Sequence, residues 1–274
     1  MKTKLKLPAE LGSPVWPHKI DPDNIIKAES HCLIVNEQWA DGSAVVMKMY
    51  YRRGLANFIR GIILNFRAQR EYRISRHLAD CGVPCGVPVF WTYGYCRENG
   101  FYDILCTRRI PDALSLASFL SSASQTDQTI DLGPLFQLLY DMHQCGVYHG
   151  ALSTKNILVD ATDDTRVKFY VIDLARGWLF PGSILGQRIA WFDILKLVRK
   201  IESHLGSGHC QPFLERYGLG KEAIGKFYQE AGRYKLYSRK QKRIKNMMKV
   251  KVFLFALREL INHRLRRLKF FPCL

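Results

Sequence analysis

Alternating apolar and polar residues dominate the first part of the chain, as expected of β-strands that bury one face. The predicted strands cover residues 25–26, 31–35, 44–51, 87–95 and 102–107. The turn at 40–42 has the sequence Ala-Asp-Gly and joins the second and third strands as a hairpin. A helix over 67–79 follows the third strand and ends before Gly82-Val83-Pro84. We therefore expect an antiparallel sheet with one inserted helix.

The second part of the chain follows a helical period. Helices are predicted over 115–120 and 132–144, with a polar loop over 121–128 between them. Residues 147–160 read as a loop with an apolar patch near each end. Residues 167–172 are apolar at nearly every position, which predicts a strand buried on both faces. From Arg188 onward the chain is predicted to be helical, so the fold class is α+β with two lobes.

Composition narrows the class of protein. Apolar residues make up 47% and charged residues 24%, which is ordinary for a globular protein, but the net charge of +17 predicts an anionic partner. Eight cysteines are scattered along the chain without the paired spacing of a zinc site, so we expect mostly buried, reduced thiols. Neither a signal peptide nor an apolar run long enough to span a membrane is evident, which predicts a cytoplasmic protein, soluble or peripheral on a membrane.

Lys48 and Glu71 lie at positions where burying a charged side chain costs free energy. Lys48 is inside an apolar strand, and Glu71 shares a helix face with Ala68 and Leu78. Each is the natural partner of the other. The ordinary alternatives are an edge-strand lysine that reaches solvent and a glutamate at the rim of the apolar face.

Two hard oxygen donors come later in the chain. Asn156 precedes an apolar pair, and Asp173 ends the predicted strand 167–172. Either could simply stabilise a turn or cap a helix. Together with a paired lysine they form the set that phosphoryl transfer requires, namely a cation for phosphates and oxygen ligands for a metal ion.

The order of these residues resembles the protein kinase superfamily: a strand lysine, a helix glutamate, the pattern H-x-x-L-x-x-x-N at 149–156, and Asp173. More narrowly, the chain resembles the bacterial lipopolysaccharide kinases, the group of Kdo kinase and WaaP heptose kinase. The resemblance covers about residues 30–200. The stretches that carry it are 50–55, 70–72 running to 86–88, 110–116, 149–158 and 171–173.

The resemblance implies a bilobal kinase-like fold that binds ATP and Mg²⁺ between its lobes. The implied lobes are 23–107 and 108–232, between a lead-in at 1–22 and a basic helical segment at 233–274. In that family pattern Lys48 would hold phosphates, Glu71 would position Lys48, and Asn156 and Asp173 would bind magnesium. The implied adenine hinge is Cys106, Thr107, Arg108 and Arg109. Asp193 would brace the His149 loop, although a surface acid is the alternative. The implied substrate is Kdo or heptose in the membrane-anchored lipopolysaccharide core.

The pattern breaks at one position. The family places an aspartate two residues after His149, where this chain has Ala151, and a methyl group cannot accept a proton. One hypothesis is a working kinase that relies on lysine and metal, with another acid such as Asp103 or Asp160 as a possible substitute. The other is a pseudokinase that binds nucleotide or lipopolysaccharide as a scaffold.

Basic residues gather near the C-terminus. Between 233 and 269 the only acid is Glu259, and apolar residues recur at helical spacing, namely Leu254, Leu257, Ile261, Leu265 and Leu268. Such a helix could lie on an anionic inner-membrane surface or pack its apolar face on the helical lobe. A second basic patch, over 52–70, is interleaved with apolar residues. A nucleic-acid-binding protein is the rival class, supported by charge alone.

Overall fold

The computed structural model describes residues 21–29, 31–39, 41–52, 66–96, 100–123, 130–162, 167–206, 208–217 and 221–232. The chain divides into two compact units, 1–224 and 225–274. All elements discussed below lie in the first unit, except that helix α7 (Lys221–Gly232) begins there and ends in the second.

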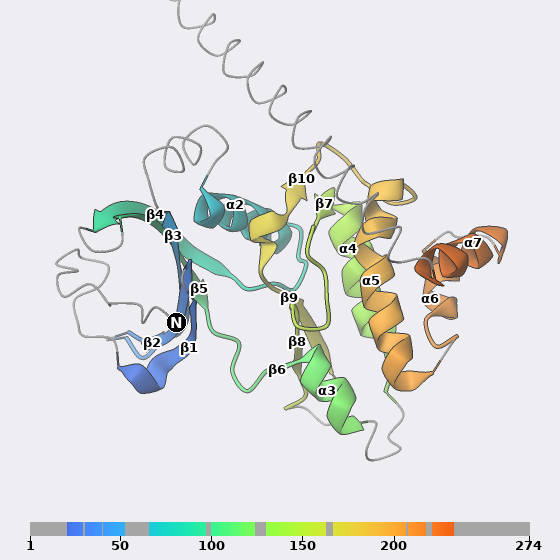
Figure 1. Cartoon of the computed structure of the whole chain (residues 1–274), viewed down its shortest axis with the longest axis horizontal. Helices are drawn as coiled ribbons and strands as arrows, with labels where there is room; N and C mark the ends of the chain where they lie inside the picture. Colours follow the sequence, from blue (N-terminus) through green and yellow to red (C-terminus); the bar gives the residue numbers. More distant parts are fainter. Residues whose placement is uncertain are drawn as a thin grey trace, which may run out of the picture. The chain divides into compact units, whose positions relative to one another are not determined.

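A five-stranded antiparallel sheet forms the N-terminal part of the first unit (Figure 1). Its strands lie in the order β1-β2-β3-β5-β4. Their bounds are β1 Ile25–Glu29, β2 Cys32–Gln38, β3 Ala44–Arg52, β4 Pro88–Cys96 and β5 Gly100–Arg108, and a short 3-10 turn, η1 (Pro22–Asn24), precedes them. The predicted strands and the β2–β3 hairpin are confirmed, each within a few residues.

Strand alternation gives this sheet two different faces. One face carries a closed apolar cluster that includes Val35, Met47, Met49, Ile104 and Cys106. The opposite face carries Lys48 and Tyr50 on β3 and Leu105 on β5. Because residues i and i+2 of a strand point the same way, Lys48 cannot share the closed apolar face with its neighbours Met47 and Met49.

Helix α2 (Arg67–Asp80) lies against the Lys48 face of the sheet (Figure 1). Its buried stripe is Ala68, Glu71, Ile74, Ser75 and Leu78, as the helical period predicts. The residue before the helix, Phe66, provides no side-chain cap. Instead, the buried carboxylate of Asp103 on β5 accepts a hydrogen bond of 2.8 Å from the Ala68 amide. The first turn of α2 is therefore fixed to the sheet by a residue thirty-five positions away.

The C-terminal part of the first unit is built mainly of helices. These are α3 (Leu116–Ala123), α4 (Gly133–Gln144), α5 (Arg188–Leu205) and α6 (Gln211–Arg216). Two small sheets accompany them: β6 (Leu114–Ser115), β8 (Ile157–Asp160) and β9 (Lys168–Val171) form one, and β7 (Val147–Tyr148) pairs with β10 (Trp178–Leu179) in the other. A 3-10 turn, η2 (Leu174–Arg176), follows β9. The predicted α+β class is confirmed, and so are the helices after Arg188 as far as residue 232.

Three local predictions were wrong. The apolar patches at the ends of 147–160 are the strands β7 and β8, because β7 pairs with β10 and β8 pairs with β6 and β9. Strand β9 is not buried on both faces, since Lys168 is exposed and Tyr170 half-buried. The loop predicted to begin at residue 121 begins later, since α3 continues to Ala123 and the Ser121 hydroxyl donates to the carbonyl of Ala117 within the helix.

The segment after α2 joins the two parts of this unit. Cys85 forms a parallel bridge with Val171 of β9. Val171 donates from its amide to the carbonyl of Pro84 and accepts from the amide of Gly86, both at 3.2 Å. The backbone between α2 and β4 thus extends the small sheet of the helical part beyond β9.

Several predicted features lie outside the described residues: the lead-in at 1–20, most of the basic patch at 52–70, and the basic tail from 233 onward. Among the residues that the structure does describe, no helix has the length and apolarity needed to cross a membrane. Six described cysteines are free; Cys32, Cys85, Cys106 and Cys210 are buried, Cys145 is half-buried and Cys81 is exposed.

Asp103 should matter for stability through its bond to α2. We expect Asp103→Ala to lower the free energy of unfolding by about 1–3 kcal/mol, since it leaves the buried Ala68 amide without this acceptor. Asp103→Asn keeps an acceptor oxygen and should cost less. The matched control is Asp80→Ala on the exposed side of the same helix, where the pair with Arg76 is worth less than about 1 kcal/mol. Urea unfolding measures all three; equal losses for Asp103→Ala and Asp80→Ala would contradict this role.

Candidate functional site

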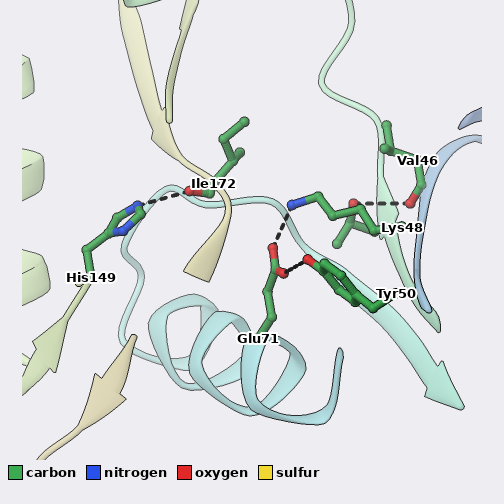
Figure 2. A network of polar contacts seen from close by, with 7 residues as sticks. Val46, Lys48, Tyr50, Glu71, His149 and Ile172 are labelled. Atoms are coloured by element: carbon green, nitrogen blue, oxygen red, sulfur yellow. Dashed lines mark hydrogen bonds and ion pairs between the residues drawn. The ribbon is translucent and has the colours of Figure 1, made fainter. Parts of the chain in front are cut away.

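A buried ion pair connects β3 to α2. The Nζ of Lys48 lies 2.7 Å from Oε1 of Glu71, and the hydroxyl of Tyr50 donates to Oε2 of the same carboxylate at 2.8 Å (Figure 2). Lys48 is 9% exposed and Glu71 2%. The predicted pairing is present, and the alternatives of a solvated lysine and a rim glutamate are excluded. Tyr50 was not anticipated, although its position two residues after Lys48 places it on the same face.

Electrostatics keep this lysine charged. Burial alone would lower the pKa of Lys48, but the charges of Glu71 and Asp173, with the hydrogen bond to Glu71, outweigh burial and raise it. Burial and the same two carboxylates raise the pKa of Tyr50 well above its usual value, so its phenol stays neutral and donates. The influence of Asp173 on both groups shows that its charge acts on the Lys48 face of the sheet.

The segment after β9 brings Asp173 to this place. Asp173 adopts a left-handed backbone conformation, with φ 63° and ψ 54°, and it makes no side-chain cap to the following turn η2. A residue other than glycine in this region is strained, although aspartate tolerates it better than most. The turn points the chain away from the direction of β9 directly after Ile172. The carboxylate of Asp173 is thereby left half-exposed at the end of the strand.

Asn156 lies beside this segment. Ile157 pairs with Val171, and the Ile172 amide donates to the Asn156 carbonyl at 3.0 Å. The antiparallel register therefore places Asn156 opposite Ile172, one residue from Asp173. The side-chain amide of Asn156 donates to the carbonyl of Ala151 at 2.9 Å, so its nitrogen is engaged within the loop. A donor nitrogen fixed in this way orients the amide oxygen.

The loop between β7 and β8 carries His149, Gly150 and Ala151. His149 is fully buried, and its Nε2 donates to the Ile172 carbonyl at 3.0 Å, because a carbonyl can only accept (Figure 2). Gly150 has φ 73°, and a Cβ there would lie 2.4 Å from the Arg176 carbonyl. Only glycine fits this approach of the loop to η2. The sequence pattern alone had not singled out Gly150.

Asp193 on α5 holds the same loop from the other side. Its Oδ2 accepts the His149 amide and its Oδ1 accepts the Gly150 amide at 2.9 Å. Oδ2 also lies 3.4 Å from Nε2 of His143 on α4, and His143 contacts the hydroxyl of Tyr217 through Nδ1. Asp193 is 3% exposed, so the alternative of a surface acid is excluded. Neither His143, inside α4, nor Tyr217, the residue after α6, was anticipated from the sequence.

The proposed hinge residues split between the two faces of the sheet. Thr107 lies on the Lys48 face and donates from Oγ1 to the Val46 carbonyl at 3.4 Å. The Cys106 side chain lies on the opposite face, fully buried in the apolar cluster. The Arg108 amide donates to Val87 at 2.8 Å and the Arg109 amide to Ala44 at 2.9 Å. The structure therefore brings Thr107, but not the thiol of Cys106, to the same face as Lys48.

The two acids considered as substitutes at residue 151 are engaged elsewhere. Asp103 is a buried residue of β5, and its carboxylate accepts the hydrogen bond from the Ala68 amide in the first turn of α2. Asp160 lies at the far end of β8 from Asn156 and accepts from the amide and hydroxyl of Thr162. Neither carboxylate lies in the loop that carries Ala151.

Arg70 is a further link that the sequence did not reveal. Its Nη1 donates to the Ala175 carbonyl at 3.4 Å, and its guanidinium lies 5.1 Å from the ring centroid of Trp178. Arg70 precedes Glu71 on α2. The helix that holds Lys48 therefore also contacts the segment that follows Asp173.

A sheet lysine paired with a helix glutamate, facing a histidine loop and an aspartate after a short strand, defines the class of protein kinase-like folds. Comparison with solved structures agrees. A WaaP structure in complex with acyl carrier protein matches with a TM-score of 0.52 at 15% identity, over 77% of this chain and 88% of that one.

Residues 34–199 match the lipopolysaccharide kinase (Kdo/WaaP) family model. The chain belongs to this family, as the resemblance over residues 30–200 implied. A curated relative, the 3-deoxy-D-manno-octulosonic acid kinase of Pasteurella multocida (strain Pm70), is 32% identical over 48% of this chain and 56% of its own length. The chain thus matches just over half the length of that relative.

Removing Glu71 should expose the cost of a buried charge. We expect Glu71→Ala to lower the free energy of unfolding by about 3–5 kcal/mol, because Lys48 would stay buried without its closest anion. Tyr50→Phe is the control for the second bond to Glu71 and should cost less, about 1.5–3 kcal/mol. Urea unfolding at neutral pH compares the two; a loss below that of Tyr50→Phe would refute the pairing.

The pH dependence follows from the direction of the Lys48 shift. A lysine whose folded-state pKa is raised stabilises the fold fully below its unfolded value of about 10.4 and loses that contribution as pH rises through the folded value. The contribution of Lys48 should therefore be constant between about pH 7 and 9. Lys48→Met should show the same difference from wild type at both values; a difference that shrinks steadily over this range would contradict the assignment.

Asp193 should be essential for the loop. Asp193→Ala removes the acceptor for two amides and should cost more than about 2 kcal/mol. Asp193→Asn retains one acceptor oxygen and should fall between the alanine variant and wild type. Lys200→Ala, at an exposed position of α5, is the matched control and should change stability by less than about 0.5 kcal/mol. Thermal unfolding measures the stability of all three variants. An Asp193→Ala variant as stable as wild type would contradict the role of Asp193 in holding the loop.

Proposed function

We propose that this chain is an ATP-dependent kinase that phosphorylates a Kdo or heptose sugar of the lipopolysaccharide inner core. Membership of the family and the likeness to a 3-deoxy-D-manno-octulosonic acid kinase support the reaction class. The observation that carries the proposal is the charged Lys48, buried against Glu71 and within the field of Asp173. A fold that keeps an ammonium in its interior at this cost has a use for a fixed positive charge.

The residues present fit a nucleotide and a magnesium ion. Asn156 and Asp173 offer amide and carboxylate oxygens, the hard donors that Mg²⁺ prefers. When bound, Mg²⁺ would neutralise charge on the phosphates. Lys48 would hold phosphate oxygens, Glu71 and Tyr50 would hold Lys48 in place, and the hinge at 106–109 would meet the adenine. In this role Thr107 would contribute from the Lys48 face, and Cys106 only through its backbone.

Ala151 changes what the chain can contribute to the acceptor. With alanine at residue 151, this position has no carboxylate to accept the proton of the sugar hydroxyl. That role is typically worth about 10²–10⁴-fold in rate. Phosphoryl transfer with a loose transition state depends more on charge neutralisation and alignment than on a base. Lys48 and the aligned loop from His149 to Asn156 supply those two contributions. We therefore expect slow but real turnover.

A pseudokinase is the second candidate, and Ala151 is the observation that favours it. In that case Lys48, Asn156 and Asp173 would bind nucleotide, or the sugar lipid alone would be bound, without transfer. The nucleic-acid hypothesis has only the net charge of +17 behind it. We assign that charge to an anionic substrate and to the cytoplasmic face of the inner membrane, where the protein would act peripherally.

The decisive assay measures Mg²⁺-dependent ATP binding and phosphate transfer to deacylated core oligosaccharide by the full chain. Wild type should transfer phosphate, while Lys48→Ala and Asp173→Ala should lose at least about 10²-fold in rate. Lys168→Ala, an exposed lysine on β9, is the control and should behave as wild type.

The same assay separates the two candidates through Ala151→Asp. A rate increase of about 10²-fold or more over an active wild type supports the kinase that works without a base. ATP binding without any transfer by wild type, with transfer appearing only in Ala151→Asp, establishes the pseudokinase. Absence of both ATP binding and transfer in every variant would refute both.

A further inference from the structure

Strand β4 carries a row of aromatic side chains on the face of the sheet against which α2 packs. Trp91, Tyr93 and Tyr95 alternate along the strand and therefore point the same way. Trp91, the first of them, packs against the buried cluster that includes Ala68 of α2. The other two lie further along the strand and are open to solvent, since Tyr93 is 54% exposed and Tyr95 62%.

Both exposed rings are held in place by aromatic neighbours. The ring of Tyr93 stacks with that of Phe66, the residue before α2, at a centroid distance of 5.0 Å, and with that of Trp91 at 6.2 Å. The ring of Tyr95 meets Phe101 of β5 edge-on at 5.0 Å. Exposed aromatic side chains that are already ordered lose little entropy when they bind a partner, and a contiguous group of them marks an interaction surface.

Positive charge borders this aromatic row. Helix α2 begins with the exposed Arg67, directly after the stacked Phe66. Over residues 52–76 the sequence has seven arginines and one acid, Glu71, which is buried in its ion pair. Asp103, opposite Tyr93 on β5, is also buried, and it accepts from the first turn of α2. The surface beside the row is therefore suited to an anionic partner.

We propose that Tyr93, Tyr95 and Arg67 form the surface by which this protein docks on a bilayer of anionic phospholipid. Tyrosine rings favour the boundary between headgroups and acyl chains, where the ring is in an apolar layer and the hydroxyl stays hydrated. An adjacent arginine adds attraction to the phosphates of the headgroups. The proposal rests on the proposed function in one respect, because a lipid-anchored acceptor gives the protein a reason to dock there.

The register of the sheet separates this surface from the Lys48 site. Trp91 lies opposite Leu105, and Leu105 lies opposite Lys48. Tyr95 is four residues further along β4, which is roughly 13 Å in a strand. A bilayer that meets Tyr95 therefore contacts the sheet beyond the ion pair. Substitutions at Tyr93 and Tyr95 should leave the chemistry at Lys48 unchanged.

Two other occupants fit the surface less well. A single-stranded nucleic acid stacks its bases on aromatic faces, but Tyr93 already stacks with two protein rings, which leaves little ring face for a base. A second copy of the chain could pair along β4, the last strand in the order of the sheet. Two identical surfaces rich in arginine would then face each other and repel, which opposes this pairing.

Cosedimentation of the full chain with vesicles of phosphatidylcholine and phosphatidylglycerol tests the proposal. Wild type should bind these vesicles and not vesicles of phosphatidylcholine alone. The double variant Tyr93→Ser/Tyr95→Ser should bind at least about 10-fold more weakly, because it loses the rings that enter the interface. Arg67→Gln should bind several-fold more weakly and with a smaller dependence on salt. The matched control is Ile26→Ser, a residue 54% exposed on β1 at the opposite edge of the sheet, which should bind as wild type.

A second measurement does not require the removal of any aromatic ring. Tyr95→Trp and Ile26→Trp each add one fluorophore, and vesicles that contain brominated phosphatidylcholine with phosphatidylglycerol quench indole within the bilayer. Only the added fluorescence of Tyr95→Trp should be quenched. Quenching of Ile26→Trp alone, or wild-type binding that the Tyr93→Ser/Tyr95→Ser change leaves intact, would overturn the proposal. So would binding of single-stranded DNA, or a lipid-free dimer, that is lost in the double variant while vesicle binding is not.

The assay on deacylated core oligosaccharide separates this proposal from the proposed function. Because that acceptor is free of membrane, Tyr93→Ser/Tyr95→Ser should transfer phosphate to it at the wild-type rate while binding vesicles weakly. Wild type that binds vesicles through Tyr93 and Tyr95 but never transfers phosphate would refute the kinase and leave the docking surface supported. Wild type that transfers phosphate but ignores anionic vesicles would refute the docking surface alone.

Discussion

An ammonium group inside a protein is tolerated only beside a negative charge, and Lys48 depends on Glu71 for that charge. The pairing fixes the position of α2 against β3, since neither partner can leave without burying the other uncompensated. The same helix carries Arg70, which reaches the segment after Asp173. One ion pair therefore governs both the lysine proposed to hold phosphates and, through α2, the placement of the proposed metal ligand.

A second constraint fixes the loop from His149 to Asn156. Two amides of this loop donate to Asp193, and a glycine at 150 permits close approach to η2. Ala151 lies within this framework, which is held without any contribution from its side chain. The contacts of Asp193 and Gly150 thus hold the loop in place although residue 151 carries only a methyl group. Holding the charged side chains of Lys48 and Asp173 in place does not require a base at residue 151. The described contacts provide the first, and Ala151 cannot provide the second.

Much of this arrangement could be predicted from sequence because it follows from local rules. A lysine in an apolar strand and a glutamate on an apolar helix face each demand a partner, and the structure joins them. Features set by distant contacts could not be predicted. The cap that Asp103 provides for α2 and the strand β7 depend on partners far along the chain. The left-handed backbone at Asp173 was not predicted either, because an aspartate tolerates this conformation but does not require it.

If the proposed function is correct, Lys48, Asn156 and Asp173 converge on one nucleotide. A crystal structure of the full chain with Mg²⁺ and a non-hydrolysable ATP analogue would show whether they do. We expect phosphate oxygens against the Nζ of Lys48 and a metal ion bound by oxygens of Asn156 and Asp173. An analogue bound elsewhere, with Lys48 still contacting only Glu71 and no metal at Asp173, would contradict it.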